Sequence, residues 1–100
     1  MSKAQLDAMV EEATVDCYNE SEQVTGLFTV IEDELTVPFK TQVLGVDVTV
    51  ERVHLNGEDQ IVATCSRENL RQSIPLLDLP LPTPPPKGAQ WIEAYRHWLG

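Results

Sequence analysis

The sequence predicts an α+β fold: an N-terminal helical hairpin, a small curved antiparallel sheet, a proline-rich strap and a C-terminal helix. Apolar residues recur at helical spacing up to position 35 and at alternating spacing from Phe39 onward. Five prolines then crowd residues 80–86 ahead of a last amphipathic segment. These changes of period place the hairpin in residues 1–37, the sheet in 38–79, and the strap and closing helix in 80–100.

The length and composition indicate one domain whose negative charge is concentrated near the N-terminus. The chain has 100 residues, 42% of them apolar, which is enough for one modest core. Its formal net charge is −9. The first 37 residues hold nine carboxylates and one lysine, so they carry −8 of that charge. Because such like charge repels itself, a hard cation that binds oxygen would relieve the repulsion.

The first helix is expected from about Lys3 to Cys17. Ser2 and Gln5 have the spacing of a capping box, and apolar residues then repeat every three or four positions. On this helix Glu12 and Asp16 stack one turn apart along one edge of the apolar stripe. Glu11 falls on the other side of the stripe.

The second helix is expected after a turn at Asn19-Glu20-Ser21, which supplies N-cap chemistry. Val24 begins its apolar repeat, which continues to Leu35. The helix should end before Val37-Pro38, because a residue that precedes proline is disfavoured in helical backbone. An antiparallel arrangement would bring the end of the first helix beside the start of the second.

Four short strands are expected next. The alternating segments cover 39–44, 46–53, 60–65 and 70–77, with a bend at Gly45 and turns after Asn56 and at 67–69. Sequentially connected strands with a bend predict a curved antiparallel sheet, which we interpret as an SH3-like partial barrel. The prolines that follow exclude a helix and favour an extended strap. From Ala89 to Leu99 the apolar spacing predicts an amphipathic helix whose two tryptophans pack onto the body.

Side-chain oxygens gather around the predicted helix–helix turn. Glu12 and Asp16 precede the turn, and Asn19, Glu20 and Glu22 follow it closely. Calcium accepts about six to eight oxygen ligands with loose geometry, so this set, completed by backbone and water, could bind the ion. A merely solvated acidic face is the alternative. Glu32 could form a second, poorer site with Asp7 or Glu11 across the hairpin, or simply contribute to solubility.

Other site chemistries find little support. An EF-hand loop beginning at Asp16 would place Ser21 where glycine is needed and Leu27 where a bidentate glutamate is needed. Cys17 and Cys65 lack CxxC spacing, so we expect free buried thiols in preference to a disulfide or a zinc site. No nucleophile constellation or phosphate loop is present, and we expect no enzymatic activity.

The remaining expectations concern partners and location. No apolar run approaches the roughly 18 residues of a membrane span, and the N-terminus lacks a signal-peptide pattern. We therefore expect a soluble, cytoplasmic monomer. An acidic chain also argues against nucleic acid or an anionic membrane as a partner.

Four segments resemble the CcbP-like family of small calcium-binding proteins of the cyanobacterial type. They are VEEATVDCYNESEQVTG (10–26), VPFKTQVLGVDVTVERVHL (37–55), IPLLDLPLPTPPP (74–86) and WIEAYRHW (91–98). The resemblance implies an intracellular calcium buffer or sequestering protein without EF-hands, with two calcium sites built from acidic residues. It implies six ligand positions that this chain offers: Glu12, Asp16, Glu22, Glu11, Asn19 and Glu32.

One turn departs from a typical calcium loop, and an alternative function stays open. The turn at Asn19-Glu20-Ser21 is less acidic than a calcium loop with the most carboxylates, which could reduce the affinity. The alternative function is an acidic protein-interaction module, or a mimic of nucleic acid, that binds no metal. Carboxylates spread over exposed edges, and not converging, would favour that alternative.

Overall fold

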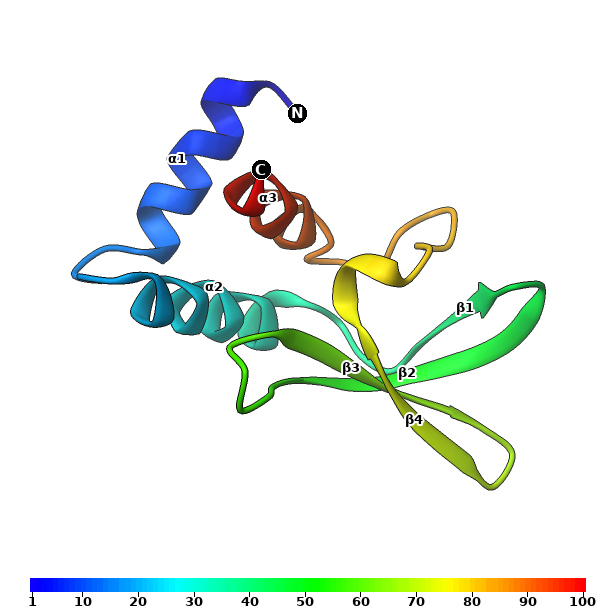
Figure 1. Cartoon of the computed structure of the whole chain (residues 1–100). Coiled ribbons are helices and arrows are strands. Elements are labelled where there is room, and N and C mark those ends of the chain that lie inside the picture. Colours follow the sequence, from blue (N-terminus) through cyan, green and yellow to red (C-terminus); the bar gives the residue numbers. More distant parts are fainter.

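The structure, a computed structural model, describes residues 1–100 and confirms the α+β class (Figure 1). Two N-terminal helices precede four antiparallel strands, a short 3-10 turn and a C-terminal helix. The elements are α1 (Lys3–Ala13), α2 (Glu20–Glu34), β1 (Phe39–Val43), β2 (Val46–Leu55), β3 (Ile61–Arg67), β4 (Leu70–Pro75), η1 (Leu76–Asp78) and α3 (Gln90–Leu99). No helix is both long enough and apolar enough to cross a membrane.

Helix α1 begins as predicted. The Gln5 N–H donates to the Ser2 hydroxyl oxygen at 3.2 Å, and the Ser2 N–H donates to the Gln5 side chain at 2.8 Å. These two reciprocal bonds satisfy backbone donors that the first turn of a helix cannot pair internally. The capping box that the sequence predicts is therefore confirmed.

Helix α1 ends at Ala13, so the predicted end at Cys17 is wrong. The Thr14 N–H and hydroxyl both donate to the Val10 carbonyl, at 2.9 and 2.7 Å. Asp16 then adopts a φ of 63°, a left-handed conformation that a short polar side chain tolerates better than most. Glu12 and Asp16 consequently do not stack one turn apart on a single helix.

The two N-terminal helices form a corner and not an antiparallel hairpin (Figure 1). At Gly26 of α2 the two helices lie so close that a Cβ atom would overlap the carbonyl oxygen of Ala13 at the end of α1. Away from this point α1 packs mainly against α3. The predicted pairing of α1 with α2 along their length is therefore replaced by more extensive packing of α1 against α3.

The four strands form an antiparallel meander in the order β1-β2-β3-β4. The β1–β2 turn consists of Leu44 and Gly45, with φ angles of 52° and 77°, as primed two-residue hairpins require. The register between β2 and β3 shifts at Glu51, which is the mark of a β-bulge. Strands β1 and β4 stay at opposite edges, so the sheet is open and the SH3-like partial barrel is not formed.

The hydrophobic core joins α2 and α3 to the sheet. Its fully buried members include Leu27 and Ile31 of α2, Val50 of β2, Ile61 of β3 and Ile92 of α3. Both tryptophans of α3 pack against this core, as the sequence predicts. Helix α1 contributes only Ala13 to it, so α1 lies at the periphery of the molecule.

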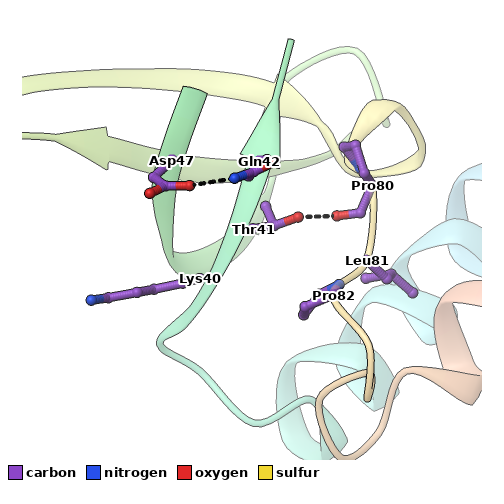
Figure 2. A pocket seen from close by; sticks show the side chains of 7 residues that line it. All are labelled: Lys40, Thr41, Gln42, Asp47, Pro80, Leu81 and Pro82. Atoms are coloured by element: carbon purple, nitrogen blue, oxygen red, sulfur yellow. Dashed lines mark hydrogen bonds between the residues drawn. The ribbon is translucent and has the colours of Figure 1, made fainter. Parts of the chain in front are cut away.

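The proline-rich segment crosses the molecule without helix or strand, as predicted. The Thr41 hydroxyl of β1 donates to the Pro80 carbonyl at 2.5 Å and anchors the start of this strap (Figure 2). At its far end the Thr36 N–H donates to the Lys87 carbonyl at 2.8 Å. Gly88 follows with a φ of 93° and lies so close to the end of α2 that a Cβ atom would overlap the Glu34 carbonyl.

Replacing Gly88 with alanine should lower the free energy of unfolding by about 2–4 kcal/mol, because a left-handed φ and a backbone overlap are penalised together. Gly45→Ala is the matched control: its φ is also positive, but nothing lies within 4 Å of the added atom. Gly45→Ala should lower the free energy of unfolding by only about 1 kcal/mol. Urea denaturation of both variants measures the difference, and equal losses would contradict the close packing of the strap against α2.

Candidate metal centre

The start of α2 organises the acidic corner between the two N-terminal helices. Asn19 caps the helix, and its side-chain oxygen accepts the Glu22 N–H at 2.9 Å. Glu22 turns back in return: its carboxylate accepts the Tyr18 N–H at 3.2 Å and the Asn19 amide at 3.1 Å. Asparagine at the cap and glutamate three residues later are the residue types that this reciprocal arrangement requires.

This capping arrangement brings two of the predicted ligands together. Each oxygen of the Glu22 carboxylate accepts one hydrogen bond, although a carboxylate offers about four lone-pair directions. Acceptor capacity therefore remains on Glu22 after the helix is capped. The positive end of the α2 dipole also favours a carboxylate at this position.

Three other predicted ligands lie on the α1 side of the corner. Glu11 and Glu12 occupy the last turn of α1 and line a shallow hollow together with Ala8 and Val15. Asp16 lies in the loop that joins the helices. All three side chains are exposed and make no hydrogen bond or ion pair with the rest of the chain.

Glu32 lies apart from the others. It is exposed near the end of α2, ten residues beyond Glu22 and so roughly 15 Å farther along the helix axis. Figure 1 shows α1 leaving the N-terminal end of α2 at a steep angle, so the two helices do not run alongside each other.

The corner is not a preformed metal site. Nowhere in the chain do three or more aspartate, glutamate, histidine or cysteine side chains lie together in an arrangement that could hold a metal ion. The donor chemistry nevertheless fits calcium, since carboxylate and amide oxygens are its usual ligands. The exposed side chains of Glu11, Glu12 and Asp16 would have to turn toward Asn19 and Glu22 to enclose an ion. The six-residue ligand set stays a prediction.

A comparison with known families decides which chemistry the chain shares. A family model described as calcium binding, CcbP, matches residues 7–99. The chain belongs to the CcbP calcium-binding family. This is a calcium-binding family and not an enzyme family. No curated protein and no solved structure matches the chain.

The two cysteines of this CcbP-family chain are free, as predicted. Cys65 is buried in the core, and burial raises the pKa of its thiol, with a further contribution from the nearby Glu51 charge. A thiol held protonated is a poor metal ligand. Cys17 is only half-buried, so the expectation of a buried thiol is wrong at this position; its sulfur lies near Gly26.

A groove between β1 and the strap is the other notable hollow, with a volume of about 450 Å³ (Figure 2). Its polar groups are largely paired: the Gln42 amide donates to Asp47 at 2.8 Å, and Thr41 is bonded to Pro80. Figure 2 shows the Lys40 side chain extending away from Gln42 and Asp47. One carboxylate beside a lysine does not make a calcium site.

The outer sheet holds a second polar cluster, which is also internally satisfied. Arg71 donates to the Glu51 carboxylate at 3.3 Å. A hydrogen bond from Ser66, followed by the bond and the charge of Arg71, lowers the pKa of Glu51. The cation that neutralises Glu51 is therefore an arginine of the same chain.

Helix α3 makes two contacts with the N-terminal helices that the sequence did not predict. His97 Nε2 lies 2.6 Å from a carboxylate oxygen of Asp7 in α1, and the Trp98 indole N–H donates to the Gln23 side chain in α2 at 3.0 Å. Residues so far apart along the chain have no shared local pattern. The only available signal was the apolar stripe of α3, which predicts burial but not a partner.

Replacing Asn19 with alanine should lower the free energy of unfolding by about 1 kcal/mol, because the first turn of α2 loses its side-chain acceptor. Asn69→Ala is the control, since Asn69 is exposed in the β3–β4 turn and its side chain makes no hydrogen bond within the protein. Thermal unfolding followed by circular dichroism compares the two. If both variants unfold like the wild type, the capping of α2 by Asn19 is refuted.

Proposed function

We propose that this chain is a single calcium-binding domain that binds Ca²⁺ reversibly at the α1–α2 corner and acts as a monomeric calcium buffer in the cytoplasm. The observation that carries the proposal is the calcium-binding family model, which matches residues 7–99. The location of the site rests on the charge, since residues 1–37 hold −8 of the net charge of −9.

Glu12, Asp16 and Glu22 are the ligands to which we give most weight, and Asn19, Glu11 and Glu32 are the further candidates. Asp16 lies on the loop between the other two, so it can turn toward either helix. The ion would supply positive charge where like charges repel one another. Calcium suits such a set better than magnesium, because magnesium demands a regular octahedral geometry at shorter distances.

An open corner suits a buffer for two reasons. The candidate side chains are exposed, so an ion can enter and leave without the core opening. Binding to the folded state alone would also stabilise it, by about 2.7 kcal/mol at a free calcium concentration of 100 times Kd. Calcium should therefore raise the unfolding temperature in proportion to the logarithm of its concentration.

A second candidate is an acidic module that binds a basic protein partner, or mimics nucleic acid, without metal. The specific observation in its favour is that the predicted ligands are exposed and that no three metal-binding side chains converge. A fixed acidic face would need no ion to assemble it.

Isothermal titration calorimetry with calcium and then with magnesium tests the proposal. We expect wild-type protein to bind calcium and to bind magnesium more weakly. Asp16→Asn should weaken calcium binding by about tenfold or more, since one charged ligand is lost. Glu22→Gln should do the same while leaving a capping side chain in place, because glutamine also serves at that position.

Asp33→Asn is the matched control, because it removes the same charge from an exposed position of α2 outside the proposed ligand set. It should change the calcium affinity by no more than about twofold. If calcium neither binds nor raises the unfolding temperature, the metal-free module is favoured. If calcium binds but Asp16→Asn and Glu22→Gln change its affinity no more than Asp33→Asn does, the site lies elsewhere.

A further inference from the structure

Two neighbouring residues of α3 each hold one of the N-terminal helices. His97 Nε2 lies 2.6 Å from the Asp7 carboxylate of α1, and the Trp98 N–H donates to Gln23 of α2 at 3.0 Å. Adjacent residues of a helix point about 100° apart, so one helix can reach two neighbours in this way. Helix α3 thus bridges the two arms of the corner (Figure 1).

This bridge matters because α1 packs more extensively against α3 than against α2. Ala13 is the only buried residue of α1, and its carbonyl meets α2 at Gly26. Helix α3 therefore contributes most of the packing that sets the direction of α1. The contact of His97 with Asp7 is the polar part of this packing.

Each contact of α3 lies close to a proposed calcium ligand. Gln23 directly follows Glu22, and Asp7 is five residues before Glu12 on the same helix. At 1.5 Å per residue, Asp7 and Glu12 are about 7.5 Å apart along the axis, so a tilt of α1 moves both. The separation of Glu12 from Glu22 therefore depends on the two α3 contacts.

We propose that His97 and Trp98 are positioning residues for the calcium site: they fix the angle between α1 and α2 and so the distance between the ligands on the two helices. This inference rests on the proposed function. The Trp98 ring is itself held, since it is half-buried and stacks on Tyr95 with ring centroids 6.3 Å apart. Its indole joins the candidate site to the core and makes its fluorescence a reporter of calcium binding.

A double-mutant cycle tests the Trp98–Gln23 contact without changing any charge. Trp98→Phe and Gln23→Met each remove the hydrogen bond, and each should raise the calcium Kd about three- to tenfold. The double variant should bind no more weakly than either single variant, because the two substitutions remove the same bond. Trp91→Phe is the matched control: Trp91 is half-buried on the same helix and makes no side-chain hydrogen bond, so its Kd should stay within twofold.

Two further readouts separate positioning from general damage. Calcium should change the tryptophan fluorescence of the wild type and of Trp91→Phe but not of Trp98→Phe. On the α1 side, His97→Ala should weaken binding, whereas His97→Gln, which keeps a donor for Asp7, should restore affinity to within about threefold. Circular dichroism at the titration temperature checks that every variant is folded, and Gln23→Met serves as the test if Trp98→Phe does not fold.

The outcomes distinguish the positioning role of His97 and Trp98 from calcium binding itself. If Asp16→Asn and Glu22→Gln weaken calcium binding but Trp98→Phe, Gln23→Met and His97→Ala bind as the wild type does, the positioning role is overturned and the calcium site stands. Additive losses in the cycle would also overturn it. A wild type that binds no calcium overturns both proposals.

Discussion

The carbonyl of Ala13 rests on the bare backbone of Gly26, and the arrangement of the acidic helices depends on this contact. Any larger residue at position 26 would place an atom on the Ala13 oxygen. The loop between them is short, so a close crossing there decides where Asp16 and the first turn of α2 meet the end of α1. Because α1 packs more extensively against α3 than against α2, the direction of α1 depends largely on α3.

The hydrophobic core and most of the negative charge lie in different parts of the molecule. The core consists of side chains from α2, the sheet, the segment around η1 and α3, while α1 contributes a single residue. In Figure 1 the helices gather at one end and the two β-hairpins extend toward the other. Carboxylates of the sheet find partners within the chain, as Glu51 does with Ser66 and Arg71. Those of the corner mostly do not, which leaves them available to a cation.

Local signals predicted the elements well. The capping box at Ser2 and the N-cap at Asn19 were recognisable because each depends on residues within three positions of one another. The change to alternating spacing at Phe39 likewise located the first strand. The end of α1 was missed, since the apolar spacing continues to Cys17 while Thr14 turns its hydroxyl onto the helix it terminates.

Longer-range features could not be predicted in the same way. The hairpin was inferred from a short turn between two helices, and the partial barrel from sequentially connected strands with a bend. Neither feature determines an interhelical angle or whether edge strands meet. A glycine inside the second predicted helix was the one local sign of a close crossing. The ligand set came from composition and resemblance, so the sequence could suggest oxygen donors but not whether they converge.

Two-dimensional amide NMR during a calcium titration tests directly whether the α1–α2 corner binds the ion, because it reports every residue that has a backbone N–H. We expect the largest shift changes between Glu11 and Gln23, with a smaller set at His97 and Trp98, while the strands change little. Shift changes concentrated in the sheet or its turns, with the corner unaffected, would contradict it.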